Sequence, residues 1–77
     1  MNNKITPTVD LKVTTVFKSG IKMNGCINIV GFDRLSDFLN KDKDNYIKLY
    51  KAIVKGVDGM TVVIPKSSID YYIPKDE

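Results

Sequence analysis

Histidine is absent from this sequence, and cysteine occurs once, at Cys26. Without histidine, the serines and Cys26 lack the usual general base for nucleophilic catalysis. A zinc or haem site would lack histidine, its commonest ligand, and one cysteine cannot form a disulfide within the chain. The sequence also has no glycine-rich nucleotide-binding motif. These absences predict a protein that is not an enzyme, holds no metal or cofactor, and takes no evident small-molecule substrate.

Arginine is nearly absent too: Arg34 is the only one, so lysine supplies 11 of the 12 basic residues. Nine acidic residues leave a formal net charge of +3. Such an excess favours weak attraction to phosphate groups, but lysine lacks the planar, bidentate geometry with which arginine reads them. A solvated, lysine-rich surface with no nucleic-acid partner explains the same composition.

Long apolar runs are also missing. No segment approaches the ~20 apolar residues of a membrane span, and the first residues lack the apolar centre of a signal peptide. A single thiol agrees with a reducing compartment. We therefore expect no membrane association and a cytoplasmic location.

The length of 77 residues predicts one domain. A chain of this size buries only about 60–65% of its unfolded surface, so its own core gives little margin of stability. Small domains of this kind usually gain support from disulfides, metals or association. Because the first two are excluded, we expect a homo-oligomer, and a marginally stable monomer is the alternative.

Two neighbouring segments predict a β-hairpin. In residues 9–18 apolar and polar side chains alternate, which is the pattern of a half-buried strand. Ser19 and Gly20 follow, and this glycine allows the positive φ of a tight turn. Residues 21–29 resume the alternation with Gly25 on the apolar face, where a missing side chain marks a bend, a bulge or close backbone approach. The second strand is therefore expected to bend.

The next segment has helical spacing. Ser36 can cap a first turn, and we expect one or two helical turns packed against the sheet. A loop of alternating charge follows at residues 40–45; it lacks the glycine and terminal glutamate of a calcium-binding loop. The apolar residues of the helical segment lie at positions i, i+3 and i+4: Leu35, Phe38 and Leu39.

Further strands are expected after the loop. In residues 46–55 the apolar positions shift phase by one, which indicates a β-bulge near Tyr50 and Lys51. A short helix is the alternative interpretation of this segment. Residues 56–59 predict a turn, and residues 61–64 predict a compact strand that is buried on both faces.

The end of the sequence predicts one more strand. Pro65 interrupts the preceding strand, because proline cannot donate a hydrogen bond to its neighbour. The last strand is expected over residues 69–73, with Ile69, Tyr71 and Ile73 facing inward.

Together these elements predict the fold class. Five short strands with turns every 8–12 residues or so are typical of an all-β barrel or sandwich. At this length we expect the barrel: an all-β, five-stranded, strongly bent SH3-like or Sm-like barrel with one short helical insert. The barrel domain is expected over residues 9–77, after a flexible N-terminal arm formed by residues 1–8.

The tyrosines allow two interpretations. Base stacking needs exposed rings beside cations, and three tyrosines fall at outward or edge positions near lysines. Alternatively, the same rings fill a subunit interface with their hydroxyls in water. The tyrosines are Tyr46, Tyr50 and Tyr72, and the lysines are Lys48, Lys51 and Lys75.

Two motifs in residues 11–73 resemble those of the Sm-like superfamily of small bent barrels. The first motif has two apolar residues, a glycine, a second glycine five positions later and an apolar residue two positions after that: Val16, Phe17, Gly20, Gly25 and Ile27. The second motif is Ile64-Pro65-Lys66-Ser67-Ser68-Ile69, continued by Tyr71 and Ile73. The segments 34–40 and 46–49 are also similar to small uncharacterised bacterial domains with Sm-like barrels.

The resemblance implies a ring of identical subunits that binds RNA. The predominance of lysine over arginine predicts that this binding has low sequence specificity. By position, the implied RNA-binding residues are Asp37, Phe38, Asn40 and Lys66, with Asp33 and Leu39 as neighbouring alternatives. The arginine and glycine of the second motif are here Pro65 and Lys66, which removes one guanidinium. A structural or protein-interaction module that keeps the ring without RNA binding is the alternative function.

Overall fold

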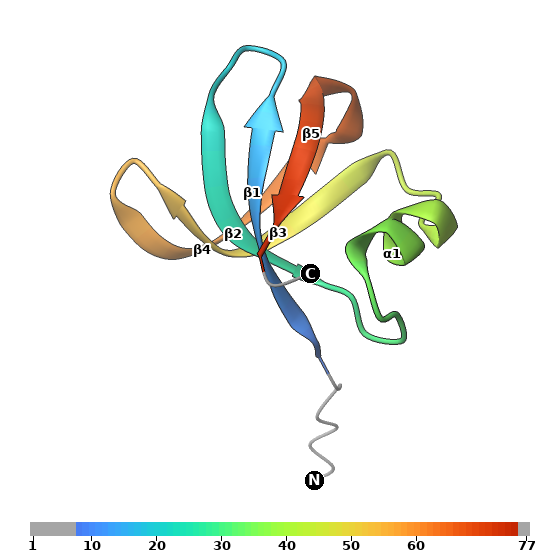
Figure 1. Ribbon diagram of the computed structural model, residues 1–77. Helices are drawn as coiled ribbons and strands as arrows, with labels where there is room; N and C mark the ends of the chain where they lie inside the picture. The colour runs from blue at the N-terminus through green and yellow to red at the C-terminus, as the bar shows by residue number, and fades with distance from the viewer. Residues whose placement is uncertain (1–7, 76–77) are drawn as a thin grey trace, which may run out of the picture.

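The fold is a five-stranded antiparallel sheet in the order β4-β3-β2-β1-β5, with one helix between β2 and β3 (Figure 1). The structure is a computed structural model that describes residues 8–75. It confirms the all-β class, and most of the expected N-terminal arm lies outside the described residues. The elements are β1 (Asp10–Phe17), β2 (Lys22–Asn28), α1 (Leu35–Lys41), β3 (Tyr46–Val54), β4 (Val57–Pro65), the 3₁₀ turn Lys66–Ser68 and β5 (Ile69–Pro74).

The expected β1–β2 hairpin is confirmed. Gly20 has a φ of +92° in the turn, and its N–H donates to the Phe17 carbonyl at 2.8 Å. Gly25 of β2 packs directly against Leu49 of β3: a Cβ atom added to the glycine would be 2.5 Å from Leu49 Cγ. The missing side chain at this position therefore allows close packing between the two strands.

The bulge expected in β3 is confirmed, and the alternative short helix does not form. Lys51 has a φ of +52°, and the pairing with β4 shifts register between Leu49 and Ala52. The extra residue keeps the apolar side chains on the core side, because Leu49 and Ala52 are both completely buried.

The expectation that residues 61–64 are buried on both faces is wrong. The strand is longer, β4 covers Val57–Pro65, and most of it is exposed; the side chain of Val63 is 56% exposed. β4 lies at one edge of the sheet, and among residues 8–75 its only partner strand is β3. An apolar strand at an edge lacks the second neighbour that would cover it.

The facing of β5 also differs from the expectation. Tyr72 packs against the core, whereas Tyr71 and Ile73 are exposed. The cause is a second bulge, since Phe17 pairs with Ile69 while the adjacent Val16 pairs with Tyr71. One additional residue reverses the side-chain alternation in the rest of a strand.

The helix α1 packs its apolar side against the sheet, as expected. Leu35 is buried, and Phe38 and Leu39 are partly buried against the core. The expected Ser36 cap is wrong: Arg34 occupies the N-cap position, with no side-chain cap hydrogen bond. No helix among the described residues has the length and apolar character needed to cross a membrane.

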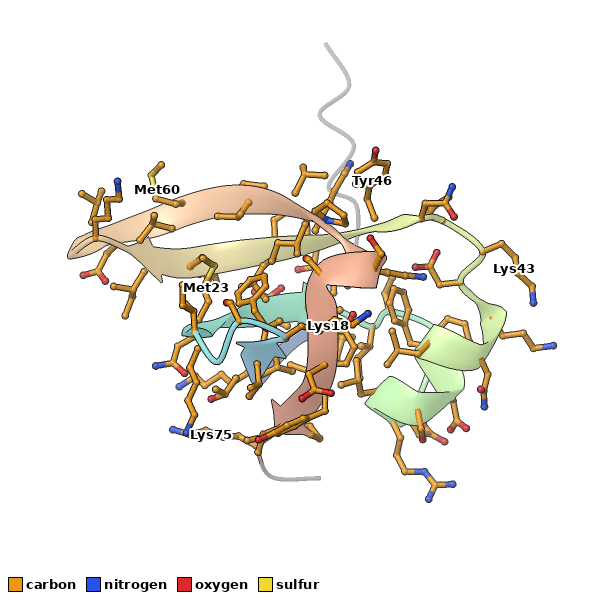
Figure 2. All side chains as sticks on the ribbon, turned by 90° about the horizontal axis from the view of Figure 1, so that it is seen from above. Lys18, Met23, Lys43, Tyr46, Met60 and Lys75 are labelled. Atoms are coloured by element: carbon orange, nitrogen blue, oxygen red, sulfur yellow. The ribbon has the colours of Figure 1, made fainter. Side chains whose placement is uncertain are left out.

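The core lies between the β3–β4 hairpin and the layer that contains β1 and β2 (Figure 2). Its members come from the strands, the β2–α1 connection and α1. The buried apolar cluster consists of Val13, Ile27, Ile29, Leu35, Ile47, Leu49, Ala52, Ile64 and Ile69.

Thr15 is a polar residue inside this apolar interior. It is 0% exposed, and its Oγ1 has no hydrogen-bond partner within the part of the chain that the structure describes. A buried hydroxyl without a partner destabilises the folded state. We expect Thr15→Val, which keeps the shape, to raise the free energy of unfolding by about 1–2 kcal/mol. Urea denaturation measures this directly, and a lower unfolding midpoint for the variant would contradict the unpartnered hydroxyl.

Candidate nucleic-acid interface

The helix α1 carries three of the four residues that the resemblance implies for RNA binding. Asp37 forms a weak ion pair with Arg34, whose Nε lies 3.7 Å from Asp37 Oδ2. Asn40 is exposed, and it lines a hollow of about 360 Å³ together with Asp37 and Lys41. The structure therefore brings Asp37 and Asn40 together on the outer side of the helix.

Phe38 belongs to a different side of the same helix. Its ring meets the Phe32 ring edge-on, with centroids 5.8 Å apart and planes at 82°. It packs against the core and lines a separate hollow from the one that contains Asp37 and Asn40. Because Phe38 is partly buried in these contacts, only its remaining surface is open to a ligand.

Lys66 is held by Asp42, the residue that follows α1. Lys66 Nζ lies 2.9 Å from Asp42 Oδ2, and the two side chains are only 27% and 16% exposed. Lys66 also donates to the Asp42 carbonyl at 3.4 Å. The pair ties the 3₁₀ turn to the end of the helix and neutralises the lysine charge. The four implied residues thus occupy three separate places.

The outward side of β3 forms a different candidate surface. Tyr46, Lys48 and Tyr50 occur at every second position before the bulge, so they share one face, with about 7 Å between neighbours. Tyr46 is 56% exposed and stands clear of the sheet in Figure 2. These residues border the tyrosine hollow, a depression of about 510 Å³ whose lining includes Asn28, Asp44, Tyr46, Lys48, Tyr50 and Val63.

Two further hollows adjoin the tyrosine hollow through shared wall residues. The middle hollow, about 440 Å³, shares Asn28 and Tyr50 with it. The lysine hollow, about 270 Å³, shares Lys51 with the middle hollow. The middle hollow also contains Asp10, Gly59 and Thr61; the lysine hollow also contains Lys12, Thr14, Asn24, Cys26, Ile53 and Lys75.

Lys51 connects the middle and lysine hollows because of the β3 bulge. Its positive φ turns the residue out of the regular alternation, and its Nζ reaches Asp10 Oδ2 at 2.7 Å. The hydrogen bond and charge of Asp10 raise the pKa of Lys51 above its ordinary value. Lys51 therefore stays protonated at neutral pH, and the Asp10 carboxylate offsets its positive charge between the two hollows.

Tyr72, which the sequence analysis expected at an outward or edge position, lines none of these three hollows. It packs against the core, and desolvation by burial, followed by the charge of Asp42, raises its pKa. Its ring is therefore less open for stacking than the rings of Tyr46 and Tyr50.

Residues 8–75 contain no group of three or more cysteine, aspartate or glutamate residues placed to hold a metal ion. Their polar surface offers lysine ammonium groups, amides, hydroxyls and tyrosine rings, which are groups of the kinds that contact phosphates and bases. Comparison of the chain with protein-family models, curated proteins and solved structures found no match.

Proposed function

We propose that the chain is an Sm-like domain that assembles into a ring and binds single-stranded RNA with low sequence specificity. The observation that carries the proposal is the open sheet, because β4 and β5 lie at opposite edges and each has one strand partner among the described residues. In this proposal the strongly bent sheet is the open form of an SH3-like or Sm-like barrel.

Both free edges carry exposed apolar side chains. On β4, Val57 is 54% and Met60 is 42% exposed, and on β5, Tyr71 is 50% and Ile73 is 45% exposed. Unpaired edges of this kind favour pairing with another strand. Pairing of β4 with β5 of the next copy uses both edges and gives a ring when the rotation between copies closes, whereas a two-fold dimer through one edge leaves the other free.

RNA binding of low specificity is supported by the charge distribution. Lysines border the tyrosine and lysine hollows, whereas Arg34 is already paired with Asp37. Lysine neutralises phosphates without fixing their orientation. The bound RNA is therefore held by charge and stacking, with little reading of base identity.

Titration of labelled RNA at several salt concentrations tests this function. We expect similar affinities for uridine-rich, adenine-rich and mixed single strands, with log affinity falling by about 0.7 per neutralised phosphate for each unit of log salt. Tight binding of one sequence that does not respond to salt would contradict the proposal, because it requires specific hydrogen bonds to bases.

A structural or protein-interaction module is the second candidate. Two contacts favour it: the ion pair between Lys66 and Asp42 and the packing of Phe38 on Phe32. In both, a residue implied for RNA binding is engaged in holding the fold together. An assembled protein that binds none of the three RNAs at low salt would establish this candidate in place of the first.

A further inference from the structure

We propose that single-stranded RNA lies in the groove formed by the tyrosine, middle and lysine hollows, with bases on Tyr46 and Tyr50 and phosphates at Lys12, Lys51 and Lys75. This inference rests on the proposed RNA binding and moves its site away from Asp37, Asn40 and Lys66; of the four implied residues, Phe38 alone lines the groove, at the tyrosine hollow. It concerns the outward faces of β1, β2 and β3.

The three hollows that form the groove adjoin one another, because neighbouring hollows have lining residues in common. Tyr50 and Asn28 border both the tyrosine and middle hollows, and Lys51 borders both the middle and lysine hollows. In Figure 2, Tyr46 and Lys75 lie on opposite sides of the molecule, so the path crosses the sheet from one side to the other. A flexible single strand can follow such a path, whereas a stiff duplex cannot.

The tyrosine hollow suits bases better than phosphates. Its outward rings provide faces on which any base can stack. Asp44 is exposed and lies in the same wall, and its carboxylate repels phosphates but accepts hydrogen bonds from the amino groups of bases. Asn28 is fixed nearby, because its Oδ1 accepts the N–H groups of Val9 at 2.9 Å and Val30 at 3.1 Å. Its Nδ2 is thereby oriented by the backbone and remains a donor for a base.

The lysine hollow suits phosphates. Lys12, Lys51 and Lys75 line it, and the neighbouring Asp10 offsets only one of these three charges. Asn24 and Thr14 line the same hollow, and Asn24 adds a side-chain amide donor of the kind that contacts phosphate oxygens. Asn24 Oδ1 accepts from Thr14 Oγ1 at 2.8 Å, which leaves the amide nitrogen of Asn24 available.

Matched lysine variants test the path of the phosphates. The double variant Lys12→Gln with Lys75→Gln removes two charges from the groove. Lys18→Gln with Lys43→Gln removes two charges from exposed residues that line none of the three hollows. In anisotropy titrations with a labelled uridine-rich single strand, we expect the groove pair to reduce the salt slope by about 1.4. The control pair should leave the slope nearly unchanged. Equal reductions by the two pairs would overturn the proposed path.

Variants of Tyr46 test the stacking. We expect Tyr46→Leu to weaken binding by about fivefold or more, the lower end of the effect of removing a stacking ring. Tyr46→Phe keeps the ring and should retain the affinity. Thermal melting of both variants confirms that they fold. Equal affinities of the leucine and phenylalanine variants would overturn the stacking.

The wild-type titration separates the two proposals. If the wild-type protein binds RNA and the groove variants behave like the controls, the groove is wrong and RNA binding remains. If the wild-type protein does not bind at low salt, RNA binding itself is overturned and the groove with it.

Discussion

The variant Gly25→Val is expected to lose about 1–3 kcal/mol of stability through overpacking. A Cβ atom at this position would lie 2.5 Å from Cγ and 2.8 Å from Cδ2 of Leu49. Leu49 has no exposed surface and belongs to the central apolar cluster, so it has no free space into which it can move. The two strands must therefore separate, or the leucine must leave its rotamer.

Thermal unfolding measures the effect, and a domain of this size loses about 4–8 °C in melting temperature for each kcal/mol. Leu49→Ala provides the control, because it removes the atoms that the valine would meet. The double variant should lose less stability than the sum of the two single variants. An unchanged melting temperature for Gly25→Val, or strict additivity, would show that close packing at Gly25 does not limit the fold.

Charged residues on the free edges are expected to dissociate the proposed ring. Met60 on β4 and Ile73 on β5 are 42% and 45% exposed, so lysine is tolerated at both positions in an isolated subunit. In a β4–β5 junction the same lysines would meet apolar side chains of the neighbouring copy, which is how natural edge strands avoid pairing. We expect Met60→Lys with Ile73→Lys to reduce the mass in solution to that of one subunit.

Ile21→Lys is the matched control for the edge variants. Ile21 is 63% exposed and lies in the β1–β2 turn, away from both free edges. The control should keep the wild-type mass, and circular dichroism should show that all variants fold. Dissociation by the control as well would mean that added charge, rather than its position on an edge, disrupts the assembly.

Local signals in the sequence predicted much of the fold. The β1–β2 hairpin follows from alternation and from Gly20, and the helix follows from the spacing of Leu35, Phe38 and Leu39. The phase shift near Lys51 located the β3 bulge. These features depend on residues that are close together in the chain, so the sequence pattern contains them.

Features that depend on distant strands were not predicted. The bulge in β5 arises where Ile69 and Tyr71 pair with β1, so alternation within the strand could not indicate that Tyr72 faces the core. Likewise, an apolar run such as that in β4 predicts a buried strand, because the sequence pattern does not indicate which strands lie at the edges of the sheet.

The candidate site was predicted only in part. Alternation in β1 and β2 placed Lys12 and Asn24 on the polar face. The sequence also indicated tyrosines at outward or edge positions near lysines. In the proposed groove, the middle and lysine hollows meet at Lys51. The bulge and the contact with Asp10 at the start of β1 set the direction of the Lys51 side chain. That contact joins residues 41 positions apart, and no local motif encodes it.

The mass of the wild-type protein in solution tests the assembly of the open sheet most directly. Light scattering at micromolar concentration should give a stable multiple of the subunit mass of 8.7 kDa, with several subunits in each particle. A stable monomer of 8.7 kDa under the same conditions would contradict the account.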